Sequence, residues 1–300
     1  MECVICGFFI KNLEPARHLP RFIRCPNCTG LVTSKKEEAL YPDTYFTEEA
    51  GGEEKGSIFS PMLNFFLWLR FRTVARFLRN KSGKILDYGC GNGKLVAYLR
   101  HKGLSVDGYD PSDGAVGLAK KRGLPVFKEI PEVQYEMIML WHSLEHSEHP
   151  LADILSLKKN LFPHGRLLIA VPNGNCLESR LFGESWFCYD WPFHRTHFTP
   201  LALSTLLQKA GFYVISADYF NPEYTISSLT QTFLNLFLPK NVLYSFVSAR
   251  RSAVSKRKLY MLGALSALIL LICSPLLLLF FLVEIITGRT AAFMNVAELS

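Results

Sequence analysis

The chain has 300 residues, 49% of them hydrophobic, and a formal net charge of +7, which allows one large domain with appendages. Part of the positive charge gathers before an apolar run near the C-terminus: Arg250, Arg251, Lys256, Arg257 and Lys258. Such a cluster is typical of the cytoplasmic face of a membrane that contains anionic lipid. No aromatic or Gly-rich RNA motif accompanies it, so a nucleic-acid partner is not expected.

The N-terminal residues carry cysteines and charges where a signal peptide has an apolar core, so we expect a cytosolic N-terminus. Cysteines in that compartment are thiols or metal ligands rather than disulfides. Cys3, Cys6, Cys25 and Cys28 form two CxxC pairs that are 18 residues apart, which predicts a zinc ribbon over residues 1–34. Four thiolates fill a tetrahedron, so this zinc would be structural. A redox CxxC is the alternative, but it explains only one pair.

The charged, glycine-containing residues 35–58 predict a linker. In residues 59–80 aromatic and arginine side chains alternate with a helical period. We favour a helix that caps the following domain. The alternative is an interfacial helix with Phe65, Phe66 and Trp68 in lipid.

The stretch KILDYGCGNGKLVAYL, residues 84–99, combines an apolar strand, an acidic residue, a glycine-rich turn and a helix. Gly89, Gly91 and Gly93 give G-x-G-x-G, which differs from the G-x-G-x-x-G of dinucleotide-binding turns. Asp87 before the turn disfavours a pyrophosphate and favours a cationic ligand. S-adenosylmethionine carries a sulfonium and an ammonium group. The stretch resembles motif I of the class I S-adenosylmethionine-dependent methyltransferases.

The resemblance continues over about residues 80–220, with further motifs in the family's order. It implies an α/β fold with a doubly wound, mostly parallel, seven-stranded sheet in a Rossmann-like core, which we place at 59–230. Asp110 ends the second strand, where the resemblance assigns it the ribose hydroxyls of the cofactor. Glu129 follows the next strand and is a weaker candidate for the adenine side.

The stretch YEMIMLWHSLEH, residues 135–146, resembles the family's fourth strand, with Tyr135 and Glu136 in place of the usual Phe-Asp pair. Its C-terminal end lies where open α/β sheets place their ligands. The predicted cofactor-binding residues are Asp87, Gly89, Cys90, Gly91, Gly93, Asp110, Glu129, Leu140 and Trp141.

The stretch PFHRTHFTPLALSTLLQKAGF, residues 192–212, resembles a subgroup of the family that is common in surface-polysaccharide and small-metabolite methylation. The 28-residue loop after strand five is rich in aromatics, which suit a sugar ring or a quinone-like substrate. An oxygen or nitrogen acceptor loses a proton, and a histidine suits that step. The candidates are His194 first, then His197, His142 and His146. The alternative is that these histidines hold loops by hydrogen bonds.

Leu259–Val283 is a run of 25 uncharged residues with Pro275 in the middle. Residues 291–299 predict a strand, which the resemblance places between strands five and six. Both ends of the apolar run then lie on one side of a membrane. We therefore predict a monotopic hairpin that bends at Pro275, with legs of roughly 24 and 20 Å, in a membrane-associated insertion at 231–288. Residues 289–300 would complete the sheet. A straight span and a buried soluble hairpin are the alternatives.

The sequence thus predicts a zinc-containing, S-adenosylmethionine-dependent methyltransferase at the cytoplasmic face of a membrane. Its partners would be membrane lipid and a small-molecule, quinone-like or lipid-linked glycan acceptor, methylated on an oxygen or other nucleophile. One alternative is a non-catalytic membrane scaffold. Another is a nucleic-acid methyltransferase that grips its substrate with the ribbon, although no Asn/Asp-Pro-Pro-Tyr motif follows strand four.

Overall fold

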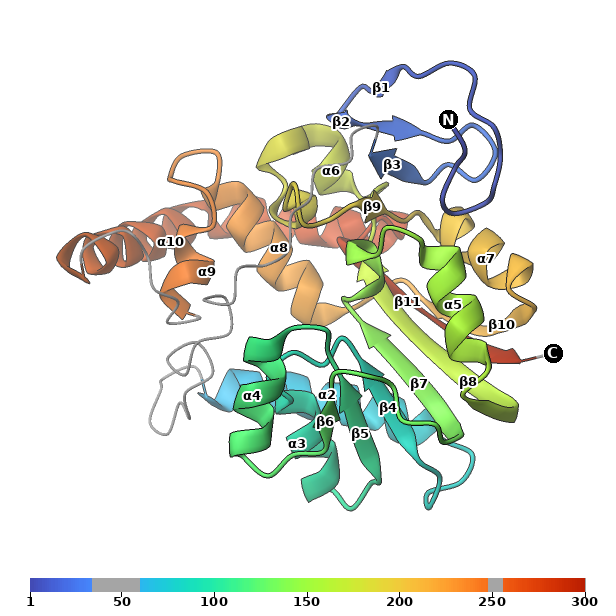
Figure 1. Ribbon diagram of the computed structural model, residues 1–300. Helices are drawn as coiled ribbons and strands as arrows, with labels where there is room; N and C mark the ends of the chain where they lie inside the picture. Colours follow the sequence, from blue (N-terminus) through green and yellow to red (C-terminus); the bar gives the residue numbers. More distant parts are fainter. Residues whose placement is uncertain (34–59, 248–255, 300) are drawn as a thin grey trace.

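The computed structural model describes residues 1–33, 60–247 and 256–299 (Figure 1). The predicted linker at 35–58 lies outside the described residues, and so do Arg250 and Arg251 of the basic cluster. The described residues form a seven-stranded sheet, a four-stranded sheet and the helices around them.

The seven-stranded sheet has the order β10-β11-β8-β7-β4-β5-β6. Strands β6, β5, β4, β7 and β8 are parallel, and β11 is antiparallel to both of its neighbours. The predicted doubly wound, mostly parallel sheet is therefore confirmed. The strands are β4 (Ile85–Tyr88), β5 (Val106–Tyr109), β6 (Val126–Phe127), β7 (Tyr135–Trp141), β8 (Leu161–Pro172), β10 (Phe212–Asp218) and β11 (Ala292–Leu299).

Helices cover both faces of this sheet because successive strand residues point to opposite sides. Ile85 and Met137 pack on the face covered by α2 (Ser60–Phe77) and α3 (Lys94–His101). Leu86 and Ile138 pack on the face covered by α5 (Pro150–Lys158) and α7 (Pro200–Lys209). Helix α4 (Asp113–Lys121) packs beside the edge strand β6. Helix α2 caps the core, as favoured from the sequence.

The N-terminal ribbon is joined to the core through a shared sheet. Its strands β1 (Pro15–Ala16), β2 (Leu19–Arg24) and β3 (Leu31–Thr33) are extended by β9 (Thr196–His197), which belongs to the region after β8. That region is not the continuous loop expected from the sequence. It holds α6 (Leu177–Phe182) and the short helices η3 (Gly183–Ser185) and η4 (Phe187–Tyr189), packed against the ribbon.

The C-terminal apolar run forms one continuous helix, α10 (Lys256–Thr287), so the predicted bend at Pro275 is wrong. Pro275 has no N–H for the carbonyl of Leu271, four residues earlier. The Ser274 hydroxyl donates a hydrogen bond of 2.9 Å to that carbonyl instead. Because the freed carbonyl is satisfied, the helix runs on through the proline. Figure 1 shows α10 lying beside α8 (Pro222–Leu234) and α9 (Val242–Val247).

The end of α10 leads directly into the sheet. Gly288 has a φ of 63°, the left-handed conformation that commonly ends a helix. Strand β11 then pairs with β8 from Ala292↔Pro172 onward and with β10 on its other side. The C-terminal segment therefore supplies the last strand at the position expected from the sequence.

Candidate functional site

The glycine-rich turn lies between β4 and α3, at the C-terminal edge of the parallel strands. Gly89, Gly91 and Gly93 have φ values of 76°, 55° and 76°, a region that favours glycine. A Cβ on Gly89 would lie 2.6 Å from the Cβ of Ser143, in the segment after β7. The turn and that segment therefore touch, and only a glycine allows the contact.

Two buried carboxylates face this turn. Asp110 accepts hydrogen bonds from the backbone N–H groups of Gly91, at 2.8 Å, and Ser112, at 2.9 Å, so it shapes the turn directly. Asp87 is 3% exposed. Burial, with a smaller contribution from the charge of Asp110, raises the pKa of Asp87 to about 7. Burial also raises the pKa of Asp110. Such a pair favours a ligand that brings positive charge.

Arg70 on α2 reaches the same edge and was missed by the sequence analysis. Its Nε and Nη2 donate hydrogen bonds of 2.9 and 2.7 Å to the carboxylate of Glu223 on α8. Its guanidinium lies 5.0 Å from the ring of Trp141. A cavity of about 380 Å³ opens here, lined among others by Arg72, Asn221 and these three residues. No local motif links α2 to α8, so the sequence held no signal for the ion pair.

A cluster of carboxylate and imidazole groups follows β7. The short helix η2 (Leu144–His146) carries Glu145 and His146, and ligand atoms of these two residues and His194 lie within 4.8 Å of one another. The Nδ1 of His142 lies 3.3 Å from Oε1 of Glu145. The sequence analysis singled out the histidines but not Glu145. The sequence did hold a signal for Glu145, because this carboxylate lies between two candidate histidines, His142 and His146, at the end of a strand.

His194 and His197 are buried, His142 and His146 are half-buried, and loss of solvation lowers the pKa values of all four. The pKa falls to about 4 for His194 and to about 3 for His146. His197 lies on β9 with its ring centroid 4.6 Å from that of Phe22 in the ribbon. His142 stacks on Tyr224 with a centroid distance of 3.4 Å. The imidazoles are therefore neutral near pH 7, and their low pKa values make them weak general bases.

The other predicted cofactor residues differ in their surroundings. Trp141 is half-buried and its ring faces Arg70. Leu140 is fully buried in the core of the sheet. Cys90 is half-buried in the turn, and Glu129 is exposed after the edge strand β6.

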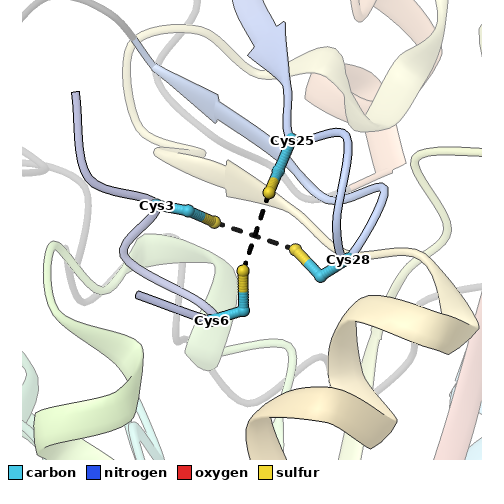
Figure 2. A group of neighbouring side chains, drawn as sticks. All are labelled: Cys3, Cys6, Cys25 and Cys28. Carbon is cyan, nitrogen blue, oxygen red and sulfur yellow. Dashed lines mark hydrogen bonds between the residues drawn. The ribbon is translucent and has the colours of Figure 1, made fainter. Parts of the chain in front are cut away.

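The four N-terminal cysteines converge as Figure 2 shows. The sulfur atoms of Cys3 and Cys28 are 3.7 Å apart, and those of Cys6 and Cys25 are 3.6 Å apart. Zn–S bonds of about 2.3 Å in a tetrahedron place sulfur atoms roughly 3.8 Å apart. The Asn27 amide donates to the Cys6 sulfur at 3.6 Å, a contact suited to a thiolate. The site therefore fits a zinc ion.

The methyltransferase domain family matches residues 67–217, just over half of the chain. The chain belongs to this family. The matched residues contain the glycine-rich turn, both carboxylates and the histidine cluster. The sequence prediction of a class I methyltransferase fold is thereby confirmed.

Among curated relatives, the ubiquinone biosynthesis O-methyltransferase of Dinoroseobacter shibae is 27% identical over 165 residues, which cover 47% of this chain and 65% of that protein. The mitochondrial ubiquinone biosynthesis O-methyltransferase of Schizosaccharomyces pombe is 31% identical over 102 residues, which cover 29% of this chain and 37% of that protein. The chain thus spans less than two thirds of either relative.

Solved structures show the same fold at low sequence identity. A protein from Galdieria sulphuraria, assigned as a sarcosine dimethylglycine methyltransferase, has a TM-score of 0.55 at 16% identity, with 86% of this chain and 98% of that chain covered. The O-methyltransferase of a trans-AT PKS multienzyme from Brevibacillus brevis, in complex with S-adenosyl-L-homocysteine, has a TM-score of 0.50 at 14% identity, with 90% and 83% covered.

Proposed function

We propose that the chain is an S-adenosylmethionine-dependent O-methyltransferase that sits on a membrane and methylates a hydroxyl of a quinone-like acceptor. One observation carries this proposal: the glycine-rich turn and the Glu145–histidine cluster lie at the same edge of the sheet. Gly89 and Ser143 are so close there that a Cβ on the glycine would clash. A donor in the turn and an acceptor at the cluster would therefore be neighbours, as a direct transfer requires.

The residues around the turn suit the cofactor. S-adenosylmethionine supplies a methyl group on a sulfonium centre, so the protein mainly positions the reactants and excludes water. Asp87 and Asp110 offer negative charge to its cationic groups, and Asp110 has the position expected for contacts with the ribose hydroxyls. Trp141 and Arg70 form the wall on the side of α2.

One observation favours a quinone-like acceptor over a glycan. The relatives at 27% and 31% identity are named for ubiquinone biosynthesis. Trp186 and Tyr189, which were expected to offer faces to a sugar ring or a quinone-like substrate, are only 1% and 5% exposed and pack against Phe22 and its neighbours in the ribbon. These two aromatics therefore form no open platform for either kind of acceptor.

The ribbon cysteines would hold a structural zinc ion. All four are buried, and their sulfur atoms have the spacing of a tetrahedral site. Four thiolates leave no position for a substrate, so this ion would contribute stability and not chemistry.

Membrane association is proposed from the surface of α10. The helix is long and apolar enough to cross a bilayer. However, half-buried side chains recur every three or four residues from Leu262 to Glu284, and Ser266 and Glu284 are fully buried. The half-buried ones include Leu262, Cys273 and Leu277. One stripe of the helix thus faces the protein and packs on α8 and α9.

The opposite stripe of α10 is apolar and exposed. Leu271, Ile272, Leu279 and Ile286 are between 59% and 82% exposed. The apolar part of α10, Tyr260–Thr287, is about 42 Å long. Because one side of it packs on the protein, we propose that its outer stripe enters one leaflet in the plane of the membrane. The basic residues that precede the apolar run would meet anionic headgroups on the cytoplasmic side.

Methyl transfer from labelled S-adenosylmethionine to a prenylated catechol in detergent micelles tests the activity. We expect the wild type to place the label in the methyl ether. Asp110→Ala is the negative control and should transfer no label. Calorimetry with the cofactor separates this function from a scaffold, because a scaffold that binds no methyl donor gives no heat. Cofactor binding without transfer to any hydroxyl of the acceptor would reject the proposed substrate class.

Flotation with anionic vesicles tests membrane association through α10. Full-length protein should float, and Leu271→Glu with Leu279→Glu should weaken flotation at least tenfold. Leu201→Glu on α7, where Leu201 is 53% exposed, is the matched control. Equal flotation of all three proteins would exclude α10 as the anchor.

A further inference from the structure

The cavity beside Trp141 adjoins the candidate site. Helix α2 forms one wall, and residues between Asp218, which ends β10, and Glu223, in the first turn of α8, form much of the other. Trp141 ends β7 directly before the segment that carries the histidine cluster. Arg70, also in the lining, is close enough to Asp87 for its charge to oppose the rise that burial causes in the pKa of Asp87. The cavity therefore lies next to the cofactor turn as well as the segment after β7.

Phe220 lies between this cavity and α10. It lines the cavity, is 41% exposed, and its ring centroid is 6.2 Å from that of Phe281 on α10, with the rings edge to face. Its backbone N–H donates a hydrogen bond of 2.9 Å to the Asp218 side chain. The hydroxyl of Thr290, just after α10, donates to the carbonyl of Tyr219. These bonds hold Phe220 at the side of the cavity that faces α10.

The apolar surface continues from Phe281 along one flank of α10. Leu278, Leu282 and Ile285 lie within about one turn of Phe281 and are 59%, 46% and 40% exposed. The α2 wall of the cavity, in contrast, carries three arginines. An apolar chain that leaves the cavity is therefore better accommodated over Phe220 and Phe281 than over α2.

We propose that Phe220 and Phe281 form an opening through which an apolar tail of the acceptor passes from the cavity into the leaflet that holds α10. This role rests on the proposed function, in which the reacting ring lies at the edge of the sheet. Exposure of an apolar tail to water is unfavourable, and the cost grows with each CH₂ group. An opening beside α10 keeps the tail in the membrane while the ring reaches the site, so it selects acceptors that carry such a tail.

Two water-soluble catechols test the opening, one with a short isoprenoid tail and one without it. The ratio of their kcat/KM values reports recognition of the tail and cancels effects that both share. Phe220→Glu and Phe281→Glu each place a charge in the opening. Phe162→Glu is the matched control, because Phe162 is also 41% exposed and lies near the start of β8, at the opposite edge of the sheet from the site. A diazirine on the tail, activated by light in the wild type, labels the residues that the tail contacts and needs no turnover.

We expect the wild type and Phe162→Glu to favour the tailed catechol by about tenfold or more, and both other variants to lose this preference. The photolabel should fall on residues 219–223 and 278–285. The proposal is overturned if the preference survives in both variants, or if the label falls on other segments.

Two controls keep the outcomes apart. Calorimetry with the cofactor shows whether each variant is folded, and the photolabel of the wild type decides the matter if one is not. A wild type that binds the cofactor but methylates neither catechol rejects the proposed function. Methylation of both catechols with equal kcat/KM rejects the opening alone.

Discussion

Removing the ribbon's zinc is expected to loosen the region around the histidines while leaving the cofactor turn intact. The variant Cys25→Ser with Cys28→Ser removes two of the four ligands. The ribbon is too short a segment to hold its fold without a metal or another crosslink, so without metal it should unfold. Strand β9 then loses its pairing with β3, which joins Leu31 to His197.

The size of the effect follows from the contacts between the ribbon and the region before α7. The Thr33 N–H donates to the Arg195 carbonyl at 3.3 Å, and the hydroxyls of Thr29 and Thr199 are 2.7 Å apart. Each hydrogen bond is worth about 1 kcal/mol, and the buried Phe22 ring adds about 2 kcal/mol. Together they stabilise the closed region by about 4 kcal/mol, which corresponds to roughly a thousandfold in local opening.

Hydrogen exchange measured by mass spectrometry checks this expectation. Peptides from residues 186–199 should exchange roughly a thousandfold faster in the variant. Peptides from 106–121 serve as the internal control, because β5 pairs with β4 and β6 in the seven-stranded sheet and α4 packs beside β6. Cofactor affinity should remain within about twofold of wild type. Unchanged exchange at 186–199 in zinc-free protein would refute the coupling.

Four further outcomes are expected. The Asp87 carboxyl has a pKa of about 7 in the fold against 3.8 normally, so ligand-free stability should fall by about 4 kcal/mol as pH rises between these values. The stability of Asp87→Asn, measured by thermal melts, should not fall over this pH range. Cofactor affinity should rise with pH up to about 7 only in the wild type. Gly89→Ala should lower stability by about 1–3 kcal/mol and weaken cofactor binding in calorimetry, because its φ is 76°. His194→Ala should reduce turnover at least a hundredfold with unchanged cofactor affinity. Ser274→Ala should cost about 1 kcal/mol in denaturant unfolding, because the carbonyl freed by Pro275 loses its donor.

The sequence predicted those parts of the site that lie close together in the chain. Asp87 lies near the end of β4, the glycines follow that strand and Asp110 follows β5, and parallel strands bring their ends to one edge. Arg70 and Glu223 were missed because their pairing depends on how α2 and α8 pack, and the chain between them holds six of the seven strands of the large sheet. Periodicity describes which face of a helix is buried, but not which distant helix it meets.

The ribbon also shows that contacts between distant parts of the chain could not be predicted from the sequence. The cysteine spacing predicted the zinc ligands, since each pair is local. The pairing of β3 with β9 joins residues far apart in the chain and depends on the complete fold. The sequence analysis therefore treated the ribbon as a separate module, whereas Phe22 packs on His197 and makes it part of the wall of the candidate site.

For α10, the premise that residues 291–299 complete the sheet was correct, but the hairpin inferred from it was wrong. Strand β11 lies in the sheet, so both ends of the helix belong to the same body. The hairpin was inferred because a run that begins and ends on one side seemed to require a return inside the membrane. A helix that lies along the protein surface meets the same condition without a bend. Its packed stripe, continuous from Leu262 to Glu284, favours this geometry, since a helix that crossed the bilayer would take its packed neighbours with it.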